Sequence, residues 1–305
     1  MTRKFLNSDL VYEFSRSPAA MIALSILVVV ALCAILAPVL ITQNPFDSAQ
    51  LDLLNSRLPP SWLPRGDAAF LLGTDEQGRD LLAALFYDAR LSLLVGLASV
   101  MFSFCIGVTL GLISGYFGGF AASVIGRLAD LQLTFPGPLV ALMVAGVVKS
   151  SMSADLQDSV MLIVVIVAIG FADWPRFMRV TRSATVVEGG EDYVLAARVM
   201  GIPSRTILRR HILPNIFRPN LVLATVGLGT AILLEATLSF LGAGVPSTTP
   251  SLGTLIRVGS TNLFSGEWWV VLFPGLLLIV IVFAINIFGD WLGDALNPRI
   301  GGRHA

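Results

Sequence analysis

The sequence predicts an all-α protein that crosses a membrane six times. Of its 305 residues, 55% are hydrophobic and only 13% are charged, and its mean hydropathy is +0.81. Soluble domains carry roughly 25% charged residues, so this chain lacks the polar surface of a water-soluble protein. Uncharged apolar runs recur along the chain, and several reach the about 20 residues with which a helix spans the hydrocarbon core. Composition and run length together favour a polytopic membrane protein over a soluble helical protein with a large core.

The six predicted spans are bounded by charged residues or by helix breakers. Pro136 and Pro138 interrupt the third span, since proline lacks the N–H that a helix interior requires. The fourth span is the shortest, because only residues 160–172 are free of charge. The spans are residues 19–41, a helix within residues 91–117, residues 131–148, a helix that starts near residue 159, residues 221–241 and residues 268–289.

The distribution of lysine and arginine predicts the orientation of the spans. If both termini lie inside, the inner segments hold fourteen basic residues and the outer segments hold six. Basic residues are enriched on the cytoplasmic side, so we expect both termini in the cytoplasm. Trp268 and Trp269 lie at one end of the last span and Trp291 at the other, as is typical of the two membrane interfaces.

The chain divides into three parts by composition. Residues 1–90 comprise the first span and a hydrophilic outer segment, residues 91–295 form the membrane core, and residues 296–305 form a cytoplasmic tail. The outer segment becomes helical where Thr74 and Gln77 have the spacing of a capping box. We expect this helix to lie on the membrane surface through an apolar stripe formed by Leu81, Leu82, Leu85 and Phe86.

Three glycines of the second span, Gly107, Gly111 and Gly115, lie four residues apart. Small residues at this spacing share one helix face, and within lipid they let a second helix approach closely. The pattern predicts a packing face, which another subunit could also use, and it does not indicate a cofactor site.

Several kinds of chemistry are excluded by the residues that the chain lacks. Its only lysines are Lys4 and Lys149, and neither follows a glycine-rich loop that could hold the phosphates of ATP. Its only histidines, His211 and His304, cannot form a two-histidine zinc site or a serine–histidine pair within a span. Its zero net charge gives no electrostatic case for nucleic acid. We therefore expect no catalysis, metal or cofactor in this chain.

Glu235 is the one carboxylate that lies deep in a predicted apolar span. An acidic residue at a helix centre costs roughly 2.5–3.5 kcal/mol on insertion scales, and such residues usually face a wet cavity or the bundle interior. Three interpretations stay open. Glu235 lines a solute path together with Thr237 and Ser239, or it carries protons in a secondary transporter, or it bonds to a neighbouring helix in a structural role.

Residues 188–214 form a basic segment between two apolar runs. Gly201 is suited to a left-handed helix end, and Pro203 is suited to the first turn of a second helix. We expect Pro214 to end that second helix. The first helix, residues 188–200, places four residues on one face: Tyr193, Ala196, Ala197 and Met200.

This helix–turn–helix is suited to docking on another protein. The small side chains of Ala196 and Ala197 would leave the face flat enough to seat in a groove. The alternative is an ordinary basic loop held against anionic lipid head groups. A lipid-binding loop would not need a glycine–proline turn between two short helices, so we favour docking.

The same segment resembles the EAA loop of permease subunits from binding-protein-dependent ABC importers. In that pattern two alanines are followed by a glycine and, further on, by a leucine–proline pair. The acidic residue that names the motif is replaced by Leu195, which puts any ion pair at that position in doubt. The positions that match are Ala196, Ala197, Gly201, Leu213 and Pro214.

Two further stretches narrow the resemblance. FLLGTDEQGRDLLAALFYDARLSLLVG and LEATLSFLGAGVPSTTPSLGTLI are similar to the C-type subfamily of dipeptide/oligopeptide permeases. In that subfamily a proline-rich stretch of the second kind usually runs into tryptophan and glycine, whereas this chain has Leu252 and Gly253. The similarity covers nearly the whole chain, from about residue 10 to about residue 298.

The resemblance implies a type I ABC importer permease fold in a bacterial inner membrane. It also implies a second homologous permease, two ATP-binding subunits that hold ATP and Mg, and an extracytoplasmic solute-binding protein. The loop would then be the coupling helix that docks on the ATP-hydrolysing subunit. The implied solute is a dipeptide or oligopeptide, but relatives that carry nickel, opines or glutathione keep the substrate open. A membrane scaffold that recruits a cytoplasmic partner is the alternative of a different class.

Overall fold

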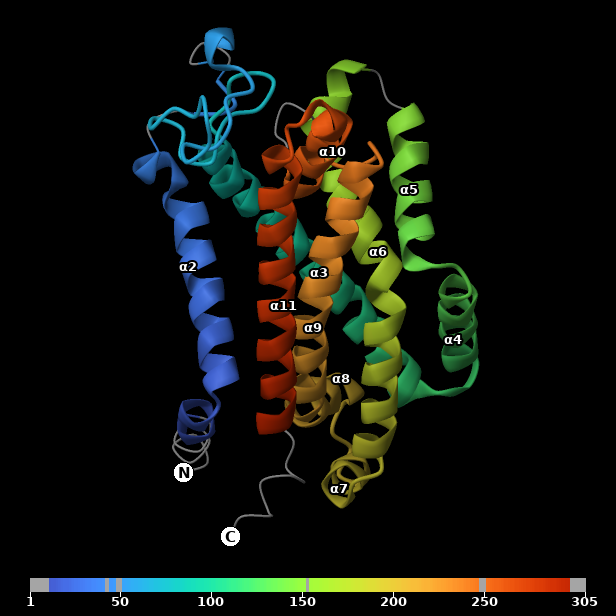
Figure 1. The fold of residues 1–305 in the computed structure, drawn as a ribbon. Coiled ribbons are helices and arrows are strands. Elements are labelled where there is room, and N and C mark those ends of the chain that lie inside the picture. The colour runs from blue at the N-terminus through green and yellow to red at the C-terminus, as the bar shows by residue number, and fades with distance from the viewer. Residues whose placement is uncertain (1–10, 42–43, 48–50, 152–153, 247–250, 297–305) are drawn as a thin grey trace.

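The computed structural model describes residues 11–41, 44–47, 51–151, 154–246 and 251–296, with the side chains of 154–159 left out. Long helices stand side by side, and irregular chain gathers at one end of the bundle (Figure 1). Within these ranges the regular elements are helical, apart from one isolated bridge between Thr74 and Asp80. The predicted all-α class is confirmed.

Among the described residues, five helices are long and apolar enough to cross a membrane, and a bent helix pair makes up to six spans. The predicted number of spans agrees with this result. The single-helix spans are α2 (Pro18–Leu40), α3 (Leu81–Phe117), α6 (Ala154–Gly189), α9 (Leu213–Phe240) and α11 (Trp269–Ala295), and the bent pair is α4 (Gly119–Leu133) with α5 (Gly137–Ser151).

The shorter elements lie at the two ends of the bundle. One end carries the outer segment, and the other carries α7 together with the first turn of α2 and the last turn of α11 (Figure 1). The predicted tail lies outside the described residues, except for Leu296. The short elements are η2 (Leu53–Asn55), α7 (Asp192–Val199), α8 (Ser204–Ile207), the π-helical turn η3 (Leu208–Ile212), α10 (Leu252–Asn262) and η4 (Leu263–Ser265).

The start of α3 corrects two predictions. Asp80 is its N-cap and accepts the backbone N–H of Leu82 at 3.1 Å. Thr74 caps no helix, because its hydroxyl donates to the carbonyl of Asn55 at 2.6 Å and so ties the outer segment together. The predicted capping box is therefore wrong. The predicted surface helix is wrong as well, because the apolar stripe belongs to the first turns of α3, where Leu81 and Leu85 are buried against α10 and α11.

The third span is broken, as the two prolines predicted. Helices α4 and α5 meet at an angle of 93°. The break falls on residues 134–136, and Pro138 then occupies the first turn of α5, where its missing N–H is not needed. The predicted span of residues 131–148 therefore begins too late, because α4 already forms from Gly119.

The fourth span is much longer than predicted. Helix α6 continues past Ala172 to Gly189 and carries Asp173 and Arg176 on the way. Charged residues do not end a helix when they can pair with each other or reach a polar surface. The end of the uncharged run at Ala172 therefore marks where the helix meets more polar surroundings, and the helix itself continues. This extension brings two ionisable side chains into the middle of the bundle.

The three-glycine face of α3 packs against α6 of the same chain. A Cβ added at Gly107 would lie 2.6 Å from the carbonyl oxygen of Trp174, and one added at Gly111 would lie 2.7 Å from that of Met178. Gly115 is equally close to the next turn of α6. Contacts that advance in step along both helices mean that α3 and α6 run parallel with their backbones in close contact.

Candidate functional site

The segment between α6 and α9 is folded back on the end of the bundle. Figure 1 shows α7 beyond the ends of the long helices, with α8 returning beside it. Two side chains of α7, Val194 and Ala197, are buried with 0% and 2% of their surface exposed. They pack against Ile207, Ile212 and Ile216 of the returning chain. This apolar contact fixes α7 to the base of α9.

The opposite face of α7 is exposed and largely apolar. The predicted docking face is therefore divided, since Ala197 points inward while Tyr193, Ala196 and Met200 are exposed. Ala197 follows Val194 by three residues, and this helical spacing puts both on the buried side. The sequence interpretation missed Leu195 and Val199, whose i, i+4 spacing could have revealed them. The exposed fractions are 41% for Tyr193, 45% for Leu195, 89% for Val199 and 71% for Met200.

The turn after α7 depends on glycine. Gly201 has φ +74°, in the left-handed region that glycine adopts without steric cost. The N–H of Ile202 then donates to the carbonyl of Ala197 at 3.1 Å, which closes the end of the helix. Pro203 is the N-cap of α8, immediately before its first turn. The turn reverses the chain so that α8 can cover the buried face of α7.

Pro214 does not end a helix, contrary to prediction. Helix α9 begins at Leu213, and Pro214 lies in its first turn. Proline is tolerated there because the preceding turn is π-helical, so Pro214 follows an interruption of the regular α-helical hydrogen bonds. The π-helical turn η3 leads into α9 directly. The segment that contains α7 and α8 is therefore joined to α9 without an intervening loop.

Asn215 connects three parts of this site. Its amide nitrogen donates to the carboxylate of Glu188 at 2.6 Å and to the hydroxyl of Tyr193 at 2.8 Å. Glu188 lies at the end of α6, Tyr193 on α7 and Asn215 at the start of α9. The sequence interpretation missed Asn215, because these contacts join residues far apart in sequence.

Glu235 is fully buried between α9 and α3. Its carboxylate accepts hydrogen bonds from the hydroxyls of Ser92 at 3.0 Å and Ser239 at 2.7 Å. Thr237 lies on the exposed side of α9, with its hydroxyl bonded to the carbonyl of Leu233 at 2.7 Å. The three predicted path residues therefore do not share one face.

Asp88 is a second buried acid near Glu235. It lies on α3 one turn before Ser92, has no exposed surface, and its two carboxylate oxygens accept no hydrogen bond from the described residues. A buried carboxylate without a donor is costly. The sequence interpretation missed this residue because it placed residue 88 in an outer surface helix.

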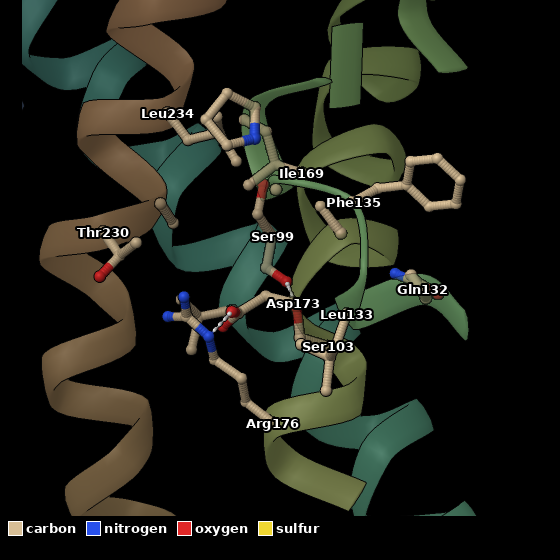
Figure 2. Close-up of a pocket in the computed structure, with 15 residues that line it drawn as sticks. Ser99, Ser103, Gln132, Leu133, Phe135, Ile169, Asp173, Arg176, Thr230 and Leu234 are labelled. Carbon is tan, nitrogen blue, oxygen red and sulfur yellow. Dashed lines mark hydrogen bonds and ion pairs between the residues drawn. The ribbon is translucent and has the colours of Figure 1, made fainter. Parts of the chain in front are cut away.

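A cavity of about 100 Å³, lined mainly by apolar residues with a few polar ones, lies beside the break between α4 and α5. Figure 2 shows that α3, α6 and α9 supply most of its other walls. Asp173 and Arg176 of α6 form an ion pair there, with 3.2 Å between Oδ1 and Nε. Thr230 of α9 completes the polar lining, and it lies seven residues before Thr237 on the same exposed helix face. The site combines the exposed apolar face of α7 with a cavity that contains an ion pair.

Two parts of the chain match known families of membrane transport proteins. Residues 107–302 match the family described as binding-protein-dependent transport system inner membrane component. Residues 7–60 match the N-terminal transmembrane domain of oligopeptide transport permease C. The chain therefore belongs to the family of inner membrane components of binding-protein-dependent transport systems.

Individual relatives cover nearly the whole chain. It is 38% identical to the di/tripeptide transport system permease protein DppC of Pseudomonas aeruginosa, over 94% of this chain and 90% of that protein. It is 39% identical to the dipeptide transport system permease protein DppC of Escherichia coli K12, over 95% and 92% respectively. The corresponding protein of Haemophilus influenzae is 37% identical over 95% and 93%.

A solved structure shows the same fold. A chain of the MetNI methionine ABC transporter in an inward-facing conformation superposes with a TM-score of 0.55 at 22% identity. The superposition covers 70% of this chain and 96% of that chain. The fold is that of a type I ABC importer permease, as the sequence resemblance implied.

Proposed function

We propose that this chain is a permease subunit of an ATP-driven importer and forms half of the transmembrane path for dipeptides or short oligopeptides. The names of its relatives support this substrate class, because the compared permeases belong to dipeptide or di/tripeptide transport systems. The similarity extends over more than nine tenths of the chain. We therefore expect the solute path and the docking segment to lie at the same positions of the sequence in this chain as in those relatives.

The proposed assembly contains four kinds of chain. A second, homologous permease supplies the other half of the path, and two ATP-binding subunits hold ATP and Mg and carry out the hydrolysis. An extracytoplasmic binding protein delivers the peptide. This chain itself performs no catalysis and binds no cofactor.

The proposed orientation puts α7 and both chain ends on the cytoplasmic side of a bacterial inner membrane. The first turn of α2, the last turn of α11 and α7 share one end of the bundle, which supports this arrangement (Figure 1). The excess of arginine and lysine in the inner segments supports it further. The outer segment then faces the binding protein.

The observation that carries the proposal is the divided surface of α7. Its buried side packs through apolar contacts against the base of α9. Its exposed side presents Leu195, Val199 and Met200 to a partner. A force applied to the exposed side reaches the spans through packed side chains and not through a flexible loop. Closure of the ATPase dimer can therefore shift the spans between two arrangements, provided that the contact at α7 differs between them.

The experiment measures ATP hydrolysis by the whole complex in proteoliposomes with a peptide-loaded binding protein. We expect stimulation in the wild type, and a loss of about tenfold or more in A196D, because a buried unpaired charge at an interface weakens docking by more than about 1.4 kcal/mol. A196S, which keeps a small side chain, serves as the matched control and should behave like wild type. Full stimulation of A196D would remove the coupling role of α7. An unstimulated wild type would favour the scaffold alternative.

A further inference from the structure

The ion pair between Asp173 and Arg176 lies where a membrane protein has a strong reason to avoid charge. Both residues belong to α6, one turn apart, and they follow an uncharged run of thirteen residues, 160–172. Each charge near the middle of a span costs roughly 2.5–3.5 kcal/mol on insertion scales. Ionisable residues at such positions usually face a cavity and mark a route for a solute or an ion.

The ion pair is not a buried pair that only holds helices together, because both of its side chains are partly exposed. The side chain of Arg176 is 55% exposed and that of Asp173 is 20% exposed. Both line the cavity, and Figure 2 shows the pair on the wall that α6 contributes, with Thr230 on the facing helix. Asp173 also reaches α9, since its Oδ2 would lie 3.8 Å from a Cβ added at Gly227. The two charges are therefore accessible from the cavity without unfolding of the bundle.

The cavity also holds an unused polar group. Ser99 is fully buried, and its hydroxyl makes no hydrogen bond with the described residues. Ser103, one turn further along α3, donates to the carbonyls of Gly170 and Ser99 at 2.9 and 3.0 Å. Buried hydroxyls normally have a partner, so the hydroxyl of Ser99 is a donor that the packing of the cavity wall leaves unused. A volume of about 100 Å³ has room for several waters.

We propose that Asp173 and Arg176 form a subsite for a zwitterionic peptide in transit. The carboxylate of Asp173 binds the peptide ammonium group, and the guanidinium of Arg176 binds the peptide carboxylate. The inference rests on the proposed function, and it adds a recognition site within the path that reads the two charged ends of the peptide backbone.

The exchange of partners explains why both signs of charge occur together. In this structure the two side chains neutralise each other at 3.2 Å. When a zwitterion enters, the internal pair opens and two new pairs form, so no charge is left unpaired at membrane depth. An unpaired buried charge is strongly destabilising, whereas an exchange of pairs costs little. Binding is therefore weak enough for release, as a transport path requires. A site that reads only backbone charges also accepts peptides with different side chains.

The test uses the complete transporter in proteoliposomes that contain ATP on the cytoplasmic side. Radiolabelled dialanine and the binding protein are supplied on the other side, and dialanine transported per ATP hydrolysed is measured. We expect the double variant D173N/R176Q to lower this ratio about tenfold, which corresponds to the loss of about one charge-assisted interaction. D173E/R176K, which keeps both charges, should recover at least half of the wild-type ratio.

The matched control is D130N/R179Q. Asp130 and Arg179 also form an ion pair that joins α6 to a neighbouring helix, but neither lines the cavity. We expect this variant to keep the wild-type ratio. A wild-type ratio in D173N/R176Q, or a D173E/R176K ratio as low as that of the neutral variant, would overturn the subsite.

Two further outcomes have a different meaning: failure of the wild-type complex to transport dialanine, and failure of the double variant to assemble. If the wild-type complex transports no dialanine, the proposed function fails, whatever the variants do. If D173N/R176Q does not assemble, D173N alone carries the test. It removes the carboxylate that binds the peptide ammonium group and keeps a side chain of the same size. A several-fold lower ratio is then expected, and an unchanged ratio would overturn the inference.

Discussion

At the scale of single residues, adjacent positions of α7 have opposite surroundings. Ala196 is exposed, and Ala197 is 2% exposed against the base of α9. The two alanines look alike in the motif, yet one is available to a partner and the other holds α7 in place. A substitution at each position should therefore affect a different property of the molecule.

We expect A197D to destabilise the cytoplasmic end of the bundle, because it buries an unpaired charge at a cost of about 3–5 kcal/mol. The melting temperature of the purified complex should fall by about 5 °C or more. It is measured from the change in tryptophan fluorescence as the complex unfolds on heating. A196D should change the melting temperature little. Equal melting temperatures for the two variants would contradict the inward orientation of Ala197.

At the scale of elements, close packing of α3 on α6 depends on the glycine face of α3. The backbone of α6 lies within 2.6–2.9 Å of the position that a Cβ would occupy at each of the three glycines. A side chain there cannot fit by rotating, because the obstacle is backbone. The contact also fixes the part of α6 that carries Asp173 and Arg176.

We expect G111L to force the two helices apart and to lower the melting temperature of the complex by several degrees, since overpacking costs typically about 1–3 kcal/mol. G146L is the matched control. Gly146 lies on α5, another membrane helix, and no atom lies within 4 Å of its added Cβ. If both variants lower the melting temperature equally, close contact at Gly111 is not the cause.

At the scale of the whole molecule, the outer segment joins distant parts of the sequence. The indole N–H of Trp269 donates to the carbonyl of Thr74 at 3.1 Å, and Arg57 pairs with Glu267 at 3.2 Å. These contacts place residues from the first quarter of the chain over the start of α11. The same segment contains acidic groups that are held away from water.

The stability of the outer segment should depend on pH through Asp75. Burial raises the pKa of Asp75 above 3.8, even though the backbone N–H groups of Arg79 and Gln77 and the charge of Arg79 oppose the rise. Burial also raises the pKa of Asp80 and of Glu267. The folded segment therefore binds protons more tightly than the unfolded chain does, so its stability rises as the pH falls through the raised pKa toward 3.8.

Hydrogen exchange, corrected for the intrinsic rate, measures this effect. Protection of residues 55–80 in the wild type should be greater at pH 4, close to the unfolded pKa of 3.8, than at pH 7. D75N keeps an acceptor for the two backbone N–H groups but cannot titrate, so its protection should depend less on pH. Protection that falls on acidification, or an unaltered response in D75N, would contradict this account.

Local patterns in the sequence identified much of the architecture. Run length located the spans, and Pro136 and Pro138 marked the break of the third. The end of α7 followed from Gly201, because φ +74° suits a residue without a side chain. These features depend on neighbouring residues, so they can be read from a short window. The role of Thr74 was missed because it depends on a contact with Asn55, which lies 19 residues away. The error at Pro214 was local, because this proline lies in the first turn of α9 and does not end a helix.

The sequence by itself determined the class of protein, the approximate spans and the turn between α7 and α8 in the segment proposed to dock on a partner, because hydropathy and backbone propensity act locally. Only the tertiary structure decided which side of α7 is free, which serines bond to Glu235, and that Asp173 and Arg176 share a cavity with Thr230 and Ser99. These arrangements arise from packing between helices that are far apart in the chain. The direction of a side chain within a bundle depends on those neighbours, and no local pattern of residues contains that information.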